Sequence, residues 1–253
     1  MPSYSDCSNN GMRFVGIIPS RYASTRFPGK PLAIIQGKPM IQVVYERVAA
    51  SELSDVMVAT DHPLIRQCVL DFGGKVVMTR PDHPSGTDRC GEAASTLSLQ
   101  EEDVVVNIQG DEPGISTTEI GLLTSLFENP DVQIATLVKP FTDEERASNP
   151  NVVKAVMAHN GRVLYFSRHA IPYQRDPGMG PVTHYQHLGI YAYRYKTLQA
   201  ITRLEPSSLE TIEKLEQLRW LQNGFDIYAA PCDYQGIGID TPEDLERYNT
   251  QHP

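Results

Sequence analysis

The stretch FVGIIPSRYASTRFPGKPL, residues 14–32, decides the fold of this chain. Its first five residues are apolar and predict a short strand buried in a covered sheet. The segment 40–51 follows it, with apolar Ile41, Val44 and Val48 at helical spacing. A strand, a loop and a helix in this order place the loop beyond the carboxyl end of the strand, where α/β proteins bind ligands. The stretch therefore predicts an α/β fold with a ligand site in its first loop.

The loop itself is basic and conformationally restricted. It carries the cations Arg21, Arg26 and Lys30, with prolines that fix the backbone and Gly29 between two of them. A solvated basic loop is the alternative interpretation. Because a stiff loop holds its charges in place before a ligand arrives, the pattern favours a cradle for a polyphosphate.

Strand and helix patterns continue to alternate through the first half of the chain. This order predicts right-handed crossovers and a three-layer, Rossmann-like α/β fold with a mainly parallel sheet. We expect residues 1–11 to be a disordered extension, residues 12–253 to form one domain, and residues 132–193 to form a smaller β-rich insertion. The expected strands are 55–60, 75–79, 104–108, 187–193 and 226–230, and the expected helices are 63–72, 118–128 and 209–221.

Composition excludes several classes of function. The chain has 253 residues and a net charge of −9, which argues against a nucleic-acid-binding protein. Its four cysteines show no metal-binding spacing and are typical of free thiols in a reducing compartment. There is no apolar run long enough to span a membrane and no apolar core of a signal peptide, so we expect a cytoplasmic protein without membrane insertion.

Two aspartates follow predicted elements at positions suited to a metal. Asp111 comes directly after the strand 104–108, and Asp240 precedes a helix that Thr241 and Asp244 can cap. Asp240 is not needed for that cap. Two carboxylates together with phosphate oxygens and water make a typical Mg²⁺ site, so Asp111 and Asp240 are the predicted metal ligands. A purely structural role for either aspartate remains the alternative.

Other sequence motifs restrict the choice further. There is no P-loop, no zinc-protease motif, no nucleophile elbow and no Rossmann glycine fingerprint. The chain instead resembles the 3-deoxy-D-manno-octulosonate (Kdo) cytidylyltransferases, a family of sugar nucleotidyltransferases. The resemblance rests on motifs that follow the family's order: IIPSRYASTRFPGKPL, ATDH, MTRPDHPSGTDR, VNIQGDEP, LYFSR, HLGIYAY, LEQLR and GIDTPEDLE.

The resemblance implies a reaction and a set of site residues. The enzyme would transfer CMP from CTP to the anomeric hydroxyl of Kdo, releasing pyrophosphate, for lipopolysaccharide or capsule synthesis. The catalytic residues would be Arg21, Lys30, Asp111 and Asp240 with Mg²⁺. The nucleotide would contact Ser20, Arg21, Arg26, Lys30, Arg80, Ser85 and Gln109, and the sugar would contact Gln109, Arg168, His187, Tyr191, Glu216 and Gln217.

The resemblance also implies a homodimer, with the interface in segment 132–193. A cytidylyltransferase for another sugar acid, such as a sialic acid, is one alternative. A noncatalytic nucleotide-binding protein on the same fold is another, because fold does not fix function. Asp111 and Asp240 beside Lys30 argue against the binder, which would need no metal pair.

Overall fold

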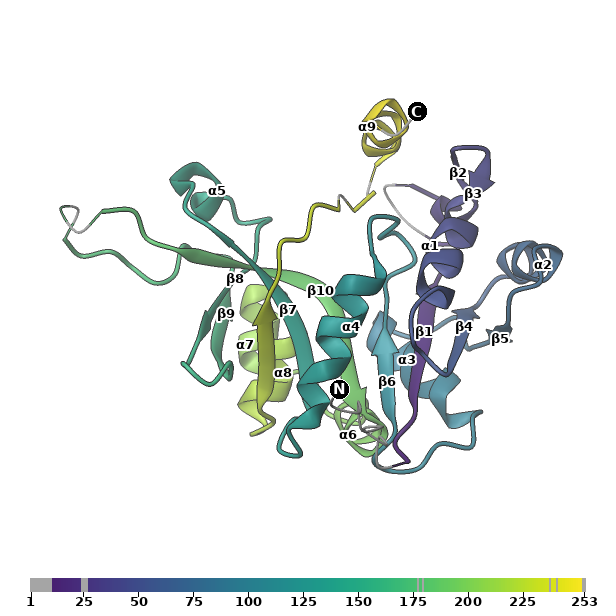
Figure 1. Ribbon diagram of the computed structural model, residues 1–253, viewed down its shortest axis with the longest axis horizontal. Coiled ribbons are helices and arrows are strands. Elements are labelled where there is room, and N and C mark those ends of the chain that lie inside the picture. The colour runs from purple at the N-terminus through teal and green to yellow at the C-terminus, as the bar shows by residue number, and fades with distance from the viewer. Residues whose placement is uncertain are drawn as a thin grey trace, which may run out of the picture.

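The computed structural model describes residues 11–23, 27–176, 178, 180–236, 238–239 and 241–251. A twisted sheet runs through the whole molecule (Figure 1). Its strand order is β11-β7-β10-β6-β1-β4-β5. The strands of this path are β1 (Phe14–Ser20), β4 (Asp55–Thr60), β5 (Val76–Met78), β6 (Val104–Asn107), β7 (Ile134–Phe141), β10 (His184–Arg194) and β11 (Ile227–Pro231).

The sheet is mostly parallel, which confirms the predicted fold class. β1 pairs in parallel with β4 and β6, β4 with β5, and β11 with β7. β10 is the exception, because it runs antiparallel between β6 and β7. The carboxyl ends of the parallel strands therefore meet at one edge of the sheet, and the amino end of β10 joins them there.

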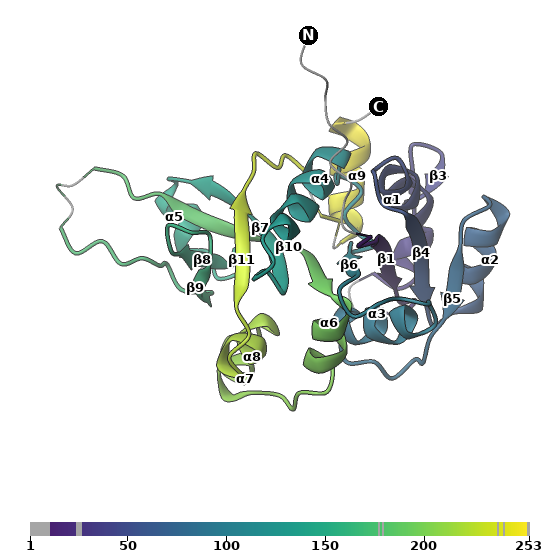
Figure 2. The same cartoon turned by 60° about the horizontal axis from the view of Figure 1, so that its bottom comes forward.

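Helices cover both faces of the sheet, as Figure 2 shows. Apolar residues such as Val44, Ile65 and Leu123 bury one face, and residues such as Ala93, Leu198 and Trp220 bury the other. The helices on the first face are α1 (Met40–Ala49), α2 (Pro63–Asp71) and α4 (Thr117–Ser125), and those on the second are α3 (Gly86–Ser95), α6 (Tyr195–Ile201), α7 (Ser208–Glu213) and α8 (Gln217–Gln222).

Short elements connect these layers. Thr241 and Asp244 cap the last helix reciprocally: the Thr241 amide donates to the Asp244 carboxylate and the Asp244 amide to the Thr241 hydroxyl, at 3.0 and 3.2 Å. None of the helices in the described ranges has both the length and the apolar character that a membrane span requires. The remaining elements are η1 (Lys30–Leu32), β2 (Ile34–Ile35), β3 (Lys38–Pro39), η2 (Leu126–Glu128), α5 (Glu144–Ser148), β8 (Lys154–Met157), β9 (Val163–Ser167) and α9 (Pro242–Gln251).

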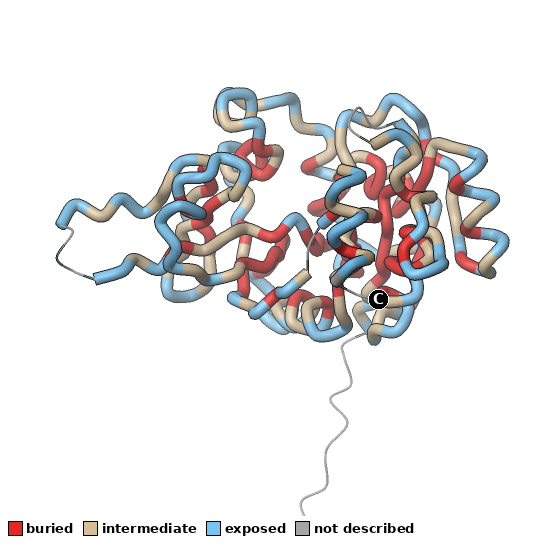
Figure 3. Tube along the Cα trace, turned by 90° about the horizontal axis from the view of Figure 1, so that it is seen from above, coloured by how far each residue is buried: buried red, intermediate tan, exposed pale blue. Residues whose placement is uncertain are grey.

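The β-rich segment differs from the predicted insertion 132–193. β7 and β10, at its two ends, are strands of the central sheet, so the segment does not form a sheet of its own. The reason is burial: Ile134 to Val138 are all buried and alternate between the two cores, as in an inner strand. Only the antiparallel pair β8 and β9 and the exposed arm that follows it extend beyond the central path (Figure 3).

The predicted helix 209–221 is also interrupted. Lys214 has a φ of 53°, which ends α7, and α8 begins at Gln217. The guanidinium of Arg168 donates to the carbonyls of Glu213 and Lys214, over 2.7 and 3.3 Å, and so satisfies the end of α7. Leu215 is turned into the core at the break.

Candidate active site

The larger of two neighbouring cavities lies at the carboxyl ends of β1 and β6 and has a volume of about 310 Å³. Its lining is polar and combines the first loop, the start of α3 and the turn after β6. We call it the nucleotide cavity. It is lined by Pro19, Ser20, Arg21, Lys30, Pro31, His83, Pro84, Ser85, Gly86, Arg89, Gln109, Gly110 and Asp111.

The folded backbone of the first loop places charged side chains of the loop at this cavity. Gly29 has a φ of 69° and its amide donates to the carbonyl of Tyr22 over 3.0 Å. Tyr22 in turn stacks on His62, with ring centroids 3.9 Å apart. Arg21 and Lys30 line the cavity from the two ends of the loop, whereas the predicted Arg26 lies outside the described residues.

Lys30 and Asp111 form an ion pair between the ammonium and Oδ2 of the carboxylate. The turn that carries Asp111 lies close to β1, because a Cβ at Gly110 would collide with the hydroxyl of Ser20. That hydroxyl is buried in the cavity wall and has no hydrogen-bond partner among the described residues. An unsatisfied buried hydroxyl beside a lysine is a group that a bound ligand can satisfy.

The start of α3 forms the opposite wall. Ser85 caps the helix and donates to Oε1 of Glu216 over 2.9 Å, while Thr87 donates to the other oxygen of Glu216 over 3.0 Å. Burial raises the pKa of Glu216 above its usual range, although these two hydroxyls oppose the shift. The predicted sugar residue Glu216 therefore joins α8 to the nucleotide wall, and does not line either cavity.

Arg89 is a cavity residue that sequence reasoning missed. Its guanidinium is buried and donates to the Thr79 hydroxyl at 2.5 Å and to the Asp61 carboxylate at 3.0 Å. Arg80, which was predicted to lie near the base, instead pairs with Asp82, and 68% of its side chain is exposed. Both arginines belong to the motif MTRPDHPSGTDR. The signal for Arg89 was its place one helical turn after the Ser85 cap, which turns it toward the sheet.

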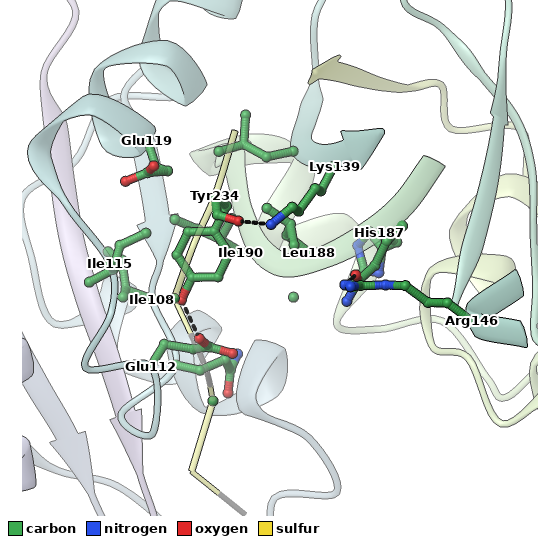
Figure 4. A pocket seen from close by; sticks show the side chains of 16 residues that line it. Ile108, Glu112, Ile115, Glu119, Lys139, Arg146, His187, Leu188, Ile190 and Tyr234 are labelled. Atoms are coloured by element: carbon green, nitrogen blue, oxygen red, sulfur yellow. Dashed lines mark hydrogen bonds between the residues drawn. The ribbon is translucent and has the colours of Figure 1, made fainter. Parts of the chain in front are cut away.

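A second cavity, of about 170 Å³, lies next to the first (Figure 4). Gln109 lines both cavities and so marks their boundary. The other residues are Ile108, Glu112, Ile115, Glu119, Leu137, Lys139, Arg146, Gln186, His187, Leu188, Gly189, Ile190, Tyr234, Gly236 and Gly238.

Charged groups of both signs line this second cavity, and none of them was predicted. The Tyr234 hydroxyl donates to Oε2 of Glu112 over 2.6 Å, and Lys139 donates to the Tyr234 carbonyl over 2.5 Å. Arg146 is held by the side-chain oxygen of Gln186 and lies over the ring of Phe141. Burial, followed by the charge of Glu112, raises the pKa of Tyr234, so its hydroxyl remains a donor.

β10 supplies the predicted His187 and Tyr191. Their ring centroids are 5.2 Å apart, so the two side chains share a face of the strand as expected. His187 Nε2 and the Tyr191 hydroxyl have no hydrogen-bond partner among the described residues. Burial lowers the pKa of His187 to about 3, which keeps the ring neutral. A β-bulge between Leu188 and Tyr191 bends the strand beside the cavity.

Two other predicted sugar residues lie away from both cavities. Arg168 donates to the Pro150 carbonyl over 2.9 Å as well as to the end of α7, and it lines a separate surface pocket. Gln217 is buried at the start of α8.

One of the two predicted metal ligands, Asp111, lies among the described residues. Asp111 offers carboxylate oxygens to the nucleotide cavity, with 34% of its side chain exposed, and hard oxygen donors suit Mg²⁺. Asp240 lies outside the described residues. Its neighbour Ile239 donates its amide to the Asp111 carbonyl over 3.0 Å, so the chain on that side reaches the same turn. Asp111, with its cavity-facing carboxylate, is the one predicted ligand among the described residues, and its chemistry fits a Mg²⁺ ion.

Comparison with known proteins decides the family. A model described as cytidylyltransferase matches residues 15–227. The chain belongs to the cytidylyltransferase family. It is 53% identical to 3-deoxy-manno-octulosonate cytidylyltransferase of Bacteroides thetaiotaomicron, over 93% of this chain and 96% of the relative. It is 50% identical to the enzyme of the same name from Cytophaga hutchinsonii, over 94% and 97%.

A solved structure supports the same assignment. The chain superposes with a TM-score of 0.89, at 41% identity, on a CMP:2-keto-3-deoxy-manno-octonic acid synthetase complexed with CTP, covering 94% of this chain and 98% of that one. These relatives confirm the resemblance read from the motifs. More distant matches, such as a cytidylyltransferase from Leptospira borgpetersenii at 18% identity and a TM-score of 0.61, share the fold.

Proposed function

We propose that this cytidylyltransferase transfers CMP from CTP to the anomeric hydroxyl of Kdo and releases pyrophosphate. The observation that carries the proposal is the match of about half of all residues, over nearly the whole chain, to relatives named for this reaction. The two cavities that meet at Gln109 supply room for a nucleotide and a second substrate side by side.

The reaction is an in-line displacement at phosphorus. The anomeric oxygen of Kdo forms a bond to the α-phosphorus of CTP, and the bond from that phosphorus to the bridging oxygen of pyrophosphate breaks. The hydroxyl loses its proton to solvent, and the electron pair of the broken bond leaves with pyrophosphate. Because the charge on the leaving group grows during this step, positioned cations make the main contribution to stabilising the transition state.

The residues of the nucleotide cavity have roles that follow from their places. Lys30 and Arg21 bind the triphosphate and neutralise the leaving pyrophosphate. Ser20 donates its unsatisfied hydroxyl to the nucleotide. Ser85 lines the cavity at the start of α3, where its hydroxyl is bonded to Glu216, and would lie near the cytosine. We expect Arg26, which lies outside the described residues, to contact the nucleotide as well. Gln109, at the boundary of the two cavities, orients the sugar toward the α-phosphate.

Mg²⁺ held by Asp111 and Asp240 is part of this proposal. When bound, the ion lowers the pKa of the attacking hydroxyl and offsets phosphate charge. Lys30 holds the Asp111 carboxylate at the cavity through their ion pair. We expect Asp111→Asn and Asp240→Asn to lose most activity, and we expect excess EDTA to stop wild-type turnover. Turnover in EDTA would contradict the metal assignment.

The sugar acid lies in the second cavity, beside β10. His187 lines this cavity, and its Nε2, which lacks a partner among the described residues, is a hydrogen-bonding group for the hydroxyls of the sugar. Tyr191, which was predicted to contact the sugar directly, lines neither cavity: it packs against Tyr193 and Trp220 and contacts the ring of His187. Buried groups of this kind reject analogues that leave them unpaired, often by about four orders of magnitude. We therefore propose strong preference for Kdo over N-acetylneuraminic acid.

The direct test is pyrophosphate release with CTP, UTP and ATP, each offered Kdo and N-acetylneuraminic acid. The expected result is turnover with CTP and Kdo alone. Turnover restricted to the sialic acid would transfer the proposal to that sugar, and nucleotide binding without release from any pair would establish a noncatalytic binder.

We also propose a homodimer formed through β8, β9 and the arm that follows. In the described residues β9 pairs only with β8, and Leu164 and Tyr173 have 51% and 85% of their surface exposed. Exposed apolar groups beside an open sheet edge favour a partner. Sedimentation velocity at micromolar concentration is expected to show a dimer.

A cytoplasmic location, with the product used for lipopolysaccharide or capsule, completes the proposal, since CTP is a cytoplasmic substrate.

A further inference from the structure

The segment 232–239 crosses the carboxyl edge of the sheet. Two hydrogen bonds hold Tyr234 within it, one through its side chain and one through its backbone. The Tyr234 hydroxyl donates to Oε2 of Glu112 over 2.6 Å. Lys139 Nζ, from β7, donates to the Tyr234 carbonyl over 2.5 Å (Figure 4). The ring between these two bonds is 8% exposed and packs in the core on the α4 side. We call Tyr234, Glu112 and Lys139 the tyrosine clamp.

Next to the clamp, the segment 232–239 packs directly against the turn after β6. A Cβ on Gly114 would stand 2.5 Å from the Cα of Gly236, so the two backbones meet without intervening side chains. Further along, the amide of Ile239 donates to the carbonyl of Asp111 over 3.0 Å. The segment that leads into Asp240 is therefore bonded to the backbone of Asp111 itself.

We infer that the tyrosine clamp positions the turn of Asp111 against the backbone at Ile239, and so holds the Asp111 carboxylate in the place that the reaction needs. Tyr234 and Lys139 act through the backbone and are positioning residues. The inference rests on the proposed function where it concerns turnover. Small displacements of positioned groups are costly in such reactions, because the reacting atoms must be held close to their attacking geometry.

The test uses Tyr234→Phe, which removes one hydroxyl and keeps the buried ring. Hydrogen exchange, followed residue by residue, is expected to be about tenfold faster at the Ile239 amide, as for the loss of a hydrogen bond to a charged group. With CTP and Kdo, kcat should fall about tenfold while the KM for CTP is unchanged, and half-maximal activity should need more Mg²⁺. Tyr228→Phe, on neighbouring β11, is the matched control and should change none of these quantities.

Lys139→Met releases the other side of Tyr234 and is expected to give the same pattern. Glu112→Gln keeps an oxygen that can accept from Tyr234 but removes the charge, so the losses in the double variant Glu112→Gln, Tyr234→Phe should be less than additive, because both changes weaken the same contact. Unchanged exchange at Ile239 in both single variants would overturn the clamp. Faster exchange with unchanged kcat and unchanged Mg²⁺ requirement would reduce the contact to packing and overturn the positioning role. The exchange experiment needs no turnover, so it decides the contact even if Kdo is not the substrate.

Discussion

The two cavities differ in how their polar groups are held. In the nucleotide cavity the charged groups are already paired, as Lys30 is with Asp111 and Arg89 with Asp61. Each cavity also has one buried polar group without a partner among the described residues: the Ser20 hydroxyl in the nucleotide cavity and His187 Nε2 in the second. The nucleotide side thus offers paired charges and a hydroxyl to its ligand, whereas the sugar side offers a buried, neutral ring nitrogen. The difference assigns charge stabilisation to one side and substrate selection to the other.

The largest effect is expected on the nucleotide side. Lys30→Met removes the ammonium that faces the triphosphate and should lower kcat by about two to three orders of magnitude, the usual cost of a charge-stabilising donor. Arg21→Ala should act in the same direction. The measurement is steady-state pyrophosphate release.

The control for this prediction is Lys38→Met, because Lys38 is half exposed and pairs with Glu46 on the surface. It should leave turnover unchanged. Near-normal rates in both cavity variants would mean that the first loop is a solvated basic loop, and the contrast between the cavities would disappear.

Glu216→Ala should lower the stability of the protein, since Glu216 joins α8 to the wall of the nucleotide cavity. The change removes the carboxylate that Ser85 and Thr87 share, but Ser85 still reaches Oδ2 of Asp88 over 2.7 Å, so the loss of unfolding free energy should be about 1–2 kcal/mol. Urea unfolding measures the loss, and Glu216→Gln should restore part of it. A stable Glu216→Ala variant with a raised KM for Kdo would instead make Glu216 a sugar ligand.

The pH dependence of stability tests the neutral state of His187. Its pKa is about 3 in the folded protein, below the ordinary value near 6.5, so the unfolded chain binds one more proton between these values. Stability attributable to this group is complete above pH 6.5 and is lost as the pH falls toward 3. At pH 5 the loss should be about 2 kcal/mol. His187→Gln should show a correspondingly shallower slope in urea unfolding between pH 6.5 and 4. Equal slopes would mean that the ring is open to solvent.

Tyr191→Phe should have the smallest effect on stability. Its buried hydroxyl has no partner among the described residues, so its removal should change the unfolding free energy by less than about 1 kcal/mol. A raised KM for Kdo with an unchanged KM for CTP is expected, because the Tyr191 ring packs against His187, which lines the sugar cavity. An unchanged KM for both substrates would mean that Tyr191 has no role in sugar binding.

The same contrast explains which parts could be predicted from sequence. The first loop and Asp111 follow parallel strands directly, and the topology of an α/β sheet brings such segments together at one edge. Lys139, Arg146 and Tyr234 come from β7, α5 and the segment after β11, and no local pattern indicates that they meet. Arg168 shows the opposite case: its motif is local, but its guanidinium donates to a carbonyl at the end of α7. The helix break at Lys214, which creates that end, depends on tertiary contacts and has no signal in the apolar spacing.

The antiparallel strand β10 has a consequence for the folding of the protein during its synthesis on the ribosome. β7 is synthesised first, yet it pairs with β10 and β11 and has no place beside β6. Until β10 emerges, seconds later at ordinary rates of synthesis, the nascent sheet ends at an open β6 edge and β7 has no neighbour. The second cavity acquires its β10 wall only when β10 closes this gap, whereas the described residues that line the nucleotide cavity all lie within 19–111. A ribosome-bound chain stalled before residue 184 would therefore carry the loop of Lys30 but no second cavity.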